Sequence, residues 1–266
     1  MAVSCAPVCL VTGASSGIGL AAARAMAERG YVVYGLSRRG VGASEVRPLL
    51  ADVTDETAVF AAVERIRQEC GRLDVVIHSA GFGISGAAEF TETVAARQQL
   101  EVNFFGAATV NRAVLPLMRQ QGAGRIIHVS SVAAMVAIPF QAYYSASKAA
   151  IQSYSLALAN EVRPFGISVC AVMPGDICTG FTTARVKSAV GDAVYGGRIA
   201  RSVGKMERDE RSGMAPESAG AFLARVATRR RVKPLYAIGV SYKAVCLLAK
   251  LLPARAVNAI VGRLYG

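Results

Sequence analysis

Short, largely apolar runs alternate with segments that carry the residue spacing of an amphipathic helix along most of the chain. Five such runs stand out, at residues 8–11, 31–34, 73–77, 125–129 and 167–172. Strands that are apolar on both faces are buried on both faces, and strands that alternate with helices form parallel sheets. The alternation therefore predicts an α/β fold of the doubly wound, Rossmann type, with a mostly parallel sheet and helices on both faces.

The length and composition suit a single domain. The chain has 266 residues, of which 53% are hydrophobic and 18% charged, so it can bury enough apolar surface to fold as one unit. After Pro174-Gly175 the alternation stops for about forty residues, and so long an interruption inside a compact domain is typical of a functional lid. We expect one domain over residues 1–266, a substrate lid over 180–215 and amphipathic helices over 241–266.

The net charge of +12 is concentrated in the last third of the chain. Residues 1–180 contain 14 Lys+Arg and 13 Asp+Glu, whereas residues 181–266 contain 16 and 5. That third has no recognisable reading helix and no interleaving of aromatic and basic residues, so we expect no nucleic-acid partner. The basic, apolar helices of 241–266 suit packing on their own domain or on a second subunit, which we prefer, or peripheral contact with a membrane surface.

The six cysteines indicate a reducing compartment. They lie mostly in apolar runs and show no zinc-ligand spacing, so we expect buried thiols and no metal site. The N-terminal segment has no basic residue before Arg24, which does not fit a targeting signal. The longest uncharged stretch, residues 126–147, contains histidine, proline and tyrosine and is not a membrane helix. We therefore expect a cytoplasmic protein.

A glycine-rich turn, Thr-Gly-Ala-Ser-Ser-Gly-Ile-Gly over residues 12–19, joins the first strand to the first helix. Glycine allows the backbone to approach a phosphate closely, and the helix N-terminus presents N–H groups to it. This location predicts a dinucleotide-binding site. The expected contacts are Gly13, Ser15, Ser16, Gly17, Ile18 and Gly19.

The end of the second strand indicates which nicotinamide cofactor binds. An acidic residue at this place binds the adenosine ribose hydroxyls, but the sequence has Ser37-Arg38 and no acid. A serine hydroxyl and a guanidinium suit a 2′-phosphate, which a carboxylate would repel. We therefore predict NADP(H) as the cofactor.

Tyr144 and Lys148 are four residues apart at the start of a predicted helix, so their Cβ atoms lie roughly 6 Å apart on one face. A cation within about 4–6 Å lowers the pKa of a phenol by about 1–3 units. We expect Lys148 to adjust Tyr144 in this way for general acid/base chemistry. Ser131 precedes this pair, and Asn103 lies on a long helix expected over residues 93–120.

Taken together, these motifs resemble the short-chain dehydrogenase/reductase family, whose T-G-x-x-x-G-x-G turn and Asn-Ser-Tyr-Lys tetrad stand here in order and spacing. The resemblance implies that Ser131 donates to the substrate oxygen and Tyr144 transfers a proton. It also implies that Lys148 holds the nicotinamide ribose and that Asn103 anchors a water relay. Further cofactor contacts implied by the family are Asp52, Val53, Ala80, Gly81, Tyr144, Lys148, Pro174, Gly175, Ile177 and Thr179.

One position departs from the family pattern. The sequence has His78-Ser79 where the family usually has two asparagines. A hydrogen bond that normally stabilises the sheet at this point must therefore be made differently or lost.

The predicted substrate is a lipophilic alcohol or ketone, because residues 132–140, between Ser131 and Tyr144, are apolar throughout. The expected substrate contacts are Ser131, Tyr144, Phe82, Met135 and Phe181, with Tyr195, Met206 and Met214 on the same rim. Residues 81–86 and the lid layout resemble the branch that contains 17β-hydroxysteroid dehydrogenases and retinol or keto-lipid reductases.

We therefore expect an oxidoreductase that interconverts a secondary alcohol and a ketone, or a primary alcohol and an aldehyde, and that forms a dimer or tetramer. The alternative is a catalytically idle NADP(H)-binding sensor or partner-binding protein. The intact tetrad argues against that alternative, because a pure binder has no use for a tyrosine poised beside a lysine.

Overall fold

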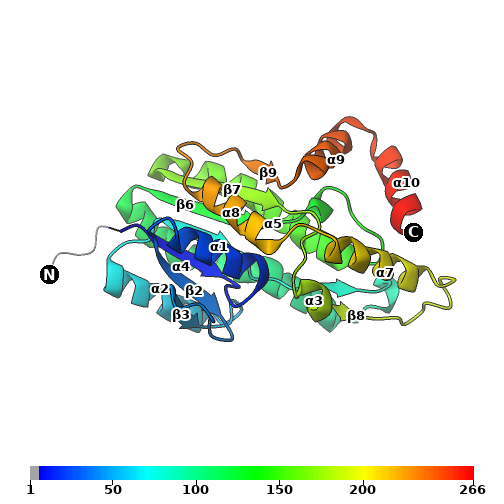
Figure 1. Ribbon diagram of the computed structural model, residues 1–266, viewed down its shortest axis with the longest axis horizontal. Coiled ribbons are helices and arrows are strands. Elements are labelled where there is room, and N and C mark those ends of the chain that lie inside the picture. Colours follow the sequence, from blue (N-terminus) through cyan, green and yellow to red (C-terminus); the bar gives the residue numbers. More distant parts are fainter. Residues whose placement is uncertain (1–5) are drawn as a thin grey trace.

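The computed structural model describes residues 6–266, and its centre is a seven-stranded parallel sheet with the strand order β3-β2-β1-β4-β6-β7-β9 (Figure 1). The strands are β1 (Val8–Thr12), β2 (Val32–Ser37), β3 (Val46–Leu50), β4 (Val75–His78), β6 (Gly124–Val129), β7 (Ile167–Met173) and β9 (Leu235–Ala237). This sheet confirms the predicted fold class.

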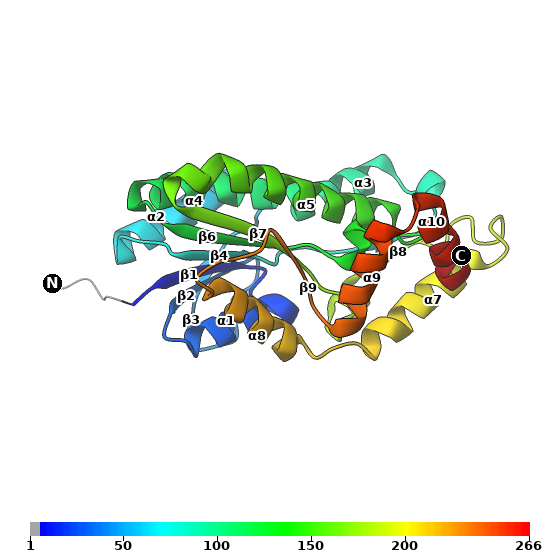
Figure 2. The same ribbon diagram turned by 90° about the horizontal axis from the view of Figure 1, so that it is seen from above.

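Helices cover both faces of the sheet, as Figure 2 shows from above. On one face lie α2 (Glu56–Cys70), α4 (Gly106–Gln121) and α5 (Ala142–Val162), and on the other lie α1 (Gly17–Ala27) and α8 (Pro216–Ala227). Successive side chains of a strand point to opposite faces. In β1, for example, Val8 and Leu10 pack toward α2, α4 and α5, whereas Cys9 and Val11 pack toward α1 and α8. The strands are therefore buried on both sides.

The long helix expected over residues 93–120 is divided, so this prediction was wrong in detail. The stretch consists of α3 (Thr93–Leu100), a π-helical turn η2 (Glu101–Phe105) and α4. A π-helical turn takes up one extra residue within a helix and is often found at functional sites. Here it carries Asn103 in its middle, with the side chain buried.

Residues 180–215, the segment predicted to be a lid and called the lid below, contain more regular structure than the sequence suggested. The lid comprises α6 (Phe181–Ala184), the short strand β8 (Val186–Lys187), which pairs with β5 (Ile84–Ser85), and α7 (Arg198–Arg211). The helix α7 is mostly polar and buries only Ile199, Ser202 and Met206, which is why its apolar spacing gave no clear signal. The remaining short turns are η1 (Ala88–Phe90), η3 (Val132–Ala134) and η4 (Arg163–Phe165).

Two helices follow the edge strand β9, namely α9 (Val240–Leu251) and α10 (Ala254–Tyr265). Figure 1 shows them projecting beyond β9, and Figure 2 shows α10 returning beside α7 of the lid. The Tyr265 hydroxyl donates to Asp209 of α7 at 3.0 Å. One face of this helix pair therefore packs on its own domain.

Within residues 6–266, no helix combines the length and the apolar character that a membrane span requires.

The five cysteines of this part of the chain are all unpaired, while Cys5 lies outside the described residues. The expectation of buried thiols is wrong for Cys178, which is exposed because it stands in the loop that leads into the lid. No group of three metal-ligating side chains occurs in the described part of the chain.

Candidate active site

A cavity of about 1070 Å³ opens at the carboxyl ends of the central strands. The strand order reverses at β1, which lies between β2 and β4, and such a reversal is where ligands bind in open parallel sheets. The glycine turn, the ends of β2, β4, β6 and β7, the start of α5, the lid and the helices α9 and α10 all contribute to its wall. Every residue predicted to contact the cofactor lies in this wall.

The glycine turn is pressed against the loop after β4. Gly13 has φ +69°, and a Cβ atom built on it would lie only 2.7 Å from the Cα atom of Ala80. At the start of α1, the Ser16 side chain makes no capping hydrogen bond, and no acidic residue stands in the first turn. The N-terminal N–H groups of α1 are therefore open toward the cavity, where an anion is stabilised by them and by the helix dipole.

The part of the cavity wall that follows β2 carries the positive charge of Arg38. Ser37, Arg38 and Asp52 line the cavity, and the Arg38 side chain is 78% exposed. Its Nε atom is 4.0 Å from Asp52, so the guanidinium is not tightly paired. Asp52 accepts hydrogen bonds from the backbone N–H and the hydroxyl of Thr54 at 3.0 and 2.9 Å, which begins the turn into α2.

Three members of the predicted tetrad, Ser131, Tyr144 and Lys148, line the cavity together. Ser131 stands directly after β6, and its hydroxyl accepts from the Ala133 N–H at 3.1 Å. Lys148 is buried, and its Nζ atom donates to the carbonyl oxygen of Val129 at 2.9 Å. The lysine ammonium lies 5.8 Å from the centre of the Tyr144 ring.

Asn103, the fourth member, is buried behind this group and does not line the cavity. Its Oδ1 atom accepts from the Phe82 N–H, and its Nδ2 atom donates to the Phe82 carbonyl and to the Ser147 hydroxyl, all at 3.0 Å. Ser147 in turn donates to the Tyr144 carbonyl at 2.7 Å. Asn103 thus connects the loop after β4 to the first turn of α5, where Tyr144 lies.

Burial raises the pKa of Tyr144 to about 12, and the charge of Glu210 raises it further, while the Ser131 hydroxyl works in the opposite direction. Burial also lowers the pKa of Lys148 to about 8. The lowering of the tyrosine pKa expected from Lys148 is therefore wrong for this structure, because the loss of solvation dominates and the charges that act on the phenol are those of Glu210, Arg185 and Asp176. Tyr144 is a neutral phenol near pH 7, which is the form that donates a proton.

The substitution of His78-Ser79 for the usual asparagines is compensated by other bonds. The Thr12 hydroxyl at the end of β1 accepts from the N–H groups of Ser79 and Ala80, both at 3.2 Å, and so ties β1 to the loop after β4. His78 instead bonds to Asn111 of α4, at 2.8 Å. Of the two expected outcomes, a different hydrogen bond or none, the structure therefore shows a different one, between β1 and the loop after β4.

Sequence reasoning missed several residues that hold the site. The Gln99 side chain accepts from the Ile84 N–H at 2.8 Å and donates to the Phe82 carbonyl at 2.6 Å, which fixes the loop after β4. The Ser130 hydroxyl donates to the Lys148 carbonyl at 2.8 Å. A signal for these contacts is absent from the linear sequence, because the bonded residues are far apart along the chain.

The predicted substrate residues divide into two groups. Phe82, Phe181 and Met206 line the cavity, and the Phe181 ring lies 5.7 Å from the Tyr144 ring. The prediction was wrong for Met135, which packs in a small cluster with Met173 and Cys246 and does not line the cavity.

Two residues predicted on the rim of the substrate site also lie outside the cavity wall. They are Tyr195, whose hydroxyl donates to Glu89 at 2.7 Å, and Met214, which packs on the core between the sheet and α8.

The helices α9 and α10 supply an apolar part of the wall that the prediction did not assign to the site. Their lining residues are Val245, Leu248, Ala249, Leu252, Val257, Ile260, Val261 and Leu264. These positions recur at helical spacing, so the sequence of residues 241–266 predicts an apolar helix face. It does not indicate that this face lines the cavity.

Tyr242 of α9 contacts the loop after β7. A Cβ atom built on Gly175 would lie 2.2 Å from the Tyr242 ring, so only glycine leaves room for it. The Tyr242 hydroxyl donates to the Asp176 carboxylate. Thr179, in the same loop after β7, lies beside Gly17 of the glycine turn, where a built Cβ would come within 3.4 Å of its side chain.

Comparisons with known proteins agree with this geometry. Residues 7–189 match the family model described as short chain dehydrogenase. A curated relative from Bacteroides thetaiotaomicron, named 3-ketodihydrosphingosine reductase, is 43% identical over 226 residues, which cover 84% of each protein. An uncharacterised oxidoreductase of Escherichia coli, YbbO, is 31% identical over 95% of this chain and 93% of its own.

Solved structures show the same relation. A short-chain dehydrogenase from Streptomyces avermitilis has a TM-score of 0.82 and 32% identity over 97% of this chain and 95% of its own. A short chain dehydrogenase from Burkholderia cenocepacia, solved in complex with NADP, has a TM-score of 0.76 and 27% identity over 98% of both chains. The chain belongs to the short-chain dehydrogenase/reductase family of oxidoreductases.

Proposed function

We propose that this protein is an NADP(H)-dependent oxidoreductase that interconverts a secondary alcohol and a ketone, and that its substrate is a long-chain keto-lipid. The observation that carries the proposal is the placement of Tyr144, Ser131 and Lys148 at one end of a cavity whose further wall is apolar. Among the expected substrate classes, which were steroid, retinoid and keto-lipid, the name of the Bacteroides relative favours the keto-lipid. The site also suits the interconversion of a lipophilic primary alcohol and its aldehyde.

The described residues fit the cofactor. The open N-terminus of α1, with Gly13 and Gly17 in the left-handed region, suits a pyrophosphate, and the exposed Arg38 suits a 2′-phosphate. The Burkholderia structure in complex with NADP supports the same choice. When bound, NADPH supplies the hydride for the carbonyl carbon.

The residues of this chain then handle the proton and the orientation of the carbonyl. Ser131 donates a hydrogen bond to the substrate oxygen, and Tyr144 donates the proton to it. Lys148 holds the nicotinamide ribose beside Tyr144. Asn103, fixed by its bonds to Phe82, anchors the water chain that returns the proton from solvent.

Oxidation of NADPH in the presence of a panel of ketones tests this proposal. We expect turnover with long-chain ketones, and Tyr144→Phe should reduce kcat by about 100- to 10,000-fold. Tyr143→Phe is the matched control, because the Tyr143 hydroxyl makes only a 3.4 Å contact with the Ala88 carbonyl and does not line the cavity. Intact NADPH binding without turnover on any carbonyl would instead support an idle sensor or partner-binding protein.

We further propose that α9 and α10 contact an anionic membrane surface with the face that does not pack on the domain. Residues 236–266 contain four Lys+Arg and no Asp or Glu, and Leu247 and Leu251 of α9 are 58% and 71% exposed. Basic amphipathic helices of this kind lie at membrane interfaces. Leu248 of the same helix and Leu252 directly after it line the cavity, so a lipid substrate would enter the cavity from the bilayer.

Sedimentation with anionic vesicles checks this contact. The double variant Leu247→Glu/Leu251→Glu should lose binding, whereas Val94→Glu, an equally exposed change on α3, should retain it. Vesicle binding that is insensitive to both changes would contradict the assignment and favour packing of this face on a second subunit.

Two further properties remain proposals. A homo-oligomer, dimer or tetramer, is supported by exposed aromatic residues such as Phe105 and Phe165, and light scattering measures its mass. A cytoplasmic location is supported by the five unpaired cysteines of the described residues, because such thiols persist in a reducing compartment. Cell fractionation tests the location.

A further inference from the structure

Arg185 is a buried cation that stands between α6 and β8. Its side chain is only 1% exposed, and its Nη2 atom donates to the Glu210 carboxylate of α7. Among residues 6–266, its Nε and Nη1 atoms have no hydrogen-bond partner. Within that part of the chain, Glu210 is therefore the group to which this guanidinium is hydrogen-bonded.

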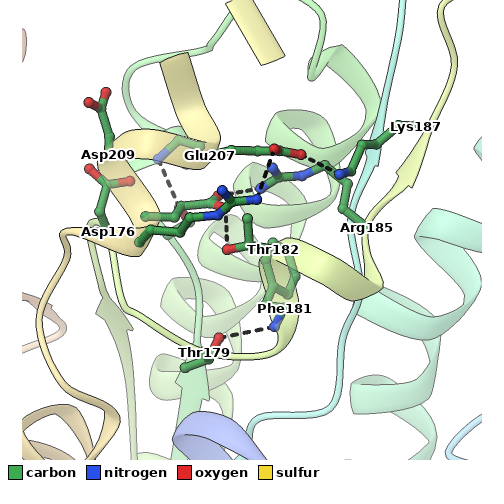
Figure 3. Close-up of polar contacts among 12 residues, drawn as sticks. Asp176, Thr179, Phe181, Thr182, Arg185, Lys187, Glu207 and Asp209 are labelled. Carbon is green, nitrogen blue, oxygen red and sulfur yellow. Dashed lines mark hydrogen bonds and ion pairs between the residues drawn. The ribbon is translucent and has the colours of Figure 1, made fainter. Parts of the chain in front are cut away.

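Glu210 is fixed in the wall of the cavity. It lines the cavity, and its second carboxylate oxygen accepts from the Thr182 hydroxyl of α6 at 2.7 Å. Figure 3 shows Thr182 and Arg185 in one cluster with Glu207 and Asp209 of α7. The ion pair and the threonine bond together connect α6 to α7.

The Phe181 ring links this ion pair to Tyr144. The Arg185 guanidinium lies 5.4 Å from the centre of the Phe181 ring, and the Tyr144 ring lies 5.7 Å from it. A cation at this distance from an aromatic ring attracts it. The Phe181 N–H also donates to the Thr179 hydroxyl at 3.2 Å, as the dashed line in Figure 3 shows. Arg185 and Tyr144 thus share one aromatic neighbour.

Both members of the ion pair also act on Tyr144 through their charge. Burial is the largest cause of the raised pKa of Tyr144; the charges of Glu210 and Asp176 raise this pKa further, whereas that of Arg185 lowers it. On the side of α5, the Lys148 ammonium lies 5.8 Å from the ring. The two charges of the pair therefore oppose each other at the phenol.

The other charged groups packed around α7 lie outside the cavity wall and form pairs of their own. Because each of them has a partner of opposite charge, they leave the Arg185–Glu210 pair as a separate unit. They are Glu207 with Lys187 and Arg211, and Asp209 with Lys205.

We propose that Arg185 and Glu210 are positioning residues for Tyr144. Their buried pair keeps the Phe181 ring against the phenol and presents one positive and one negative charge to it at the same time. The pair holds together because loss of one partner leaves the other charge buried and unpaired. This inference rests on the proposed role of Tyr144 in proton transfer and adds the groups that hold it in place.

The pH dependence of kcat/KM for the oxidation of an alcohol by NADP⁺ tests the inference. In this direction Tyr144 accepts the proton, so activity rises with pH as the phenol ionises. Glu210→Gln leaves a cation near the phenol and should move this rise to lower pH by about one pH unit, the effect of a single nearby charge. Arg185→Met leaves a carboxylate instead and should move the rise to higher pH.

Two further variants complete the comparison. Glu207→Gln removes the same charge from a residue of α7 outside the cavity wall and should leave the rise in place. The double variant Arg185→Met/Glu210→Gln contains no unpaired charge, so it should fold and show the rise at the wild-type pH. Its kcat should still be about threefold to tenfold below that of the wild type, because Phe181 has lost its cationic neighbour.

Two results would overturn the inference. One is a pair of single variants that shift the rise in the same direction, or do not shift it, which would give the ion pair a purely structural role. The other is a double variant with the kcat of the wild type, and this result decides the question where a single variant does not fold.

If the wild-type protein turns over no alcohol and no carbonyl compound, the proposed function fails, and NMR titration tests the ion pair separately. The protein is labelled with isotopic carbon at the Cζ atoms of its tyrosines, and Tyr144→Phe identifies the signal of Tyr144 by its absence. Ionisation of this phenol at lower pH in Glu210→Gln than in the wild type supports the inference, and ionisation at the same pH refutes it.

Discussion

Acid should destabilise this protein through two stacked imidazoles in its core. His78 and His128 are the only histidines of the chain, and their ring centroids lie 4.7 Å apart between β4, β6 and α4. His78 Nε2 lies 2.8 Å from Asn111 Oδ1, Asn111 Nδ2 lies 3.0 Å from His128 Nε2, and His128 Nδ1 lies 2.8 Å from the Ser155 hydroxyl. The Ser155 hydroxyl is itself committed as a donor to the Ile151 carbonyl.

These hydrogen bonds are all satisfied only when both imidazole rings are neutral. His78 must donate through Nε2 and His128 through Nδ1, because the amide and the hydroxyl fix the direction of each bond. A second proton on His78 would reside on Nδ1, a buried atom without a partner. A second proton on His128 would face the N–H group of Asn111. Burial accordingly lowers the pKa of His78 to about 4, and burial together with the nearby His78 and Lys148 lowers the pKa of His128 well below 6.5.

The magnitude follows from the two pKa values of His78. The unfolded chain takes up a proton as the pH falls through 6.5, whereas the folded protein stays neutral until about pH 4, so stability is complete above pH 6.5 and falls below it. The full difference corresponds to about 3 kcal/mol, and about 2 kcal/mol of it is lost between pH 7 and pH 5.

Urea unfolding followed by circular dichroism at several pH values between 7 and 5 measures this loss; tryptophan fluorescence is not an option because the chain has no Trp. His78→Asn is the informative variant, since an asparagine amide can still donate to Asn111 but does not titrate. It should be less stable than the wild type at pH 7, and the gap should narrow by about 2 kcal/mol at pH 5. A gap that stays constant over this range would refute the assignment of a neutral, proton-excluding ring to His78.

Three further changes test other parts of the structure. Ser37→Asp should shift the ratio of kcat/KM for NADPH and NADH toward NADH by about tenfold or more, because a carboxylate repels the 2′-phosphate; an unchanged ratio would remove Ser37 from the cofactor site. Gly175→Ala should destabilise the protein by about 1–3 kcal/mol in urea unfolding, because the new Cβ overlaps the Tyr242 ring, and Tyr242→Ala in the same chain should remove this overlap. Arg185→Met should cost about 3–5 kcal/mol because it leaves Glu210 buried without its cation, and the double variant with Glu210→Gln should recover most of the loss.

The sequence was sufficient to predict the sheet, the glycine turn and the tetrad, because each depends on local spacing. Apolar runs identify buried strands, and a spacing of four places Tyr144 and Lys148 on one face of α5. The strand β3 has no such run because Arg47 and Pro48 interrupt it, and it lies at the edge of the sheet, where a proline is tolerated. The polar helix α7 was missed for the same reason, because few of its side chains are buried.

What could not be predicted depends on contacts between distant parts of the chain. The orientation of Met135 away from the cavity depends on its packing with Met173 and Cys246. The raised pKa of Tyr144 depends on its burial in the folded protein, which the spacing of Tyr144 and Lys148 along the sequence does not reveal. The role of α9 depends on the approach of Tyr242 to Gly175, two residues that no local pattern connects.

The π-helical turn at residues 101–105 contains one residue more than a regular helix would have, and this residue affects the position of Asn103 without affecting the packing of α3 and α4. An extra residue in a regular helix would rotate everything after it by about 100°, but the turn absorbs this residue and leaves α3 and α4 facing the positions they need. A one-codon deletion here would restore an ordinary helix and preserve the core, yet it would turn Asn103 away from Phe82 and Ser147. We expect such a protein to fold with its glycine turn intact and to lack the hydrogen bonds that connect the loop after β4 to α5, the helix that carries Tyr144 and Lys148.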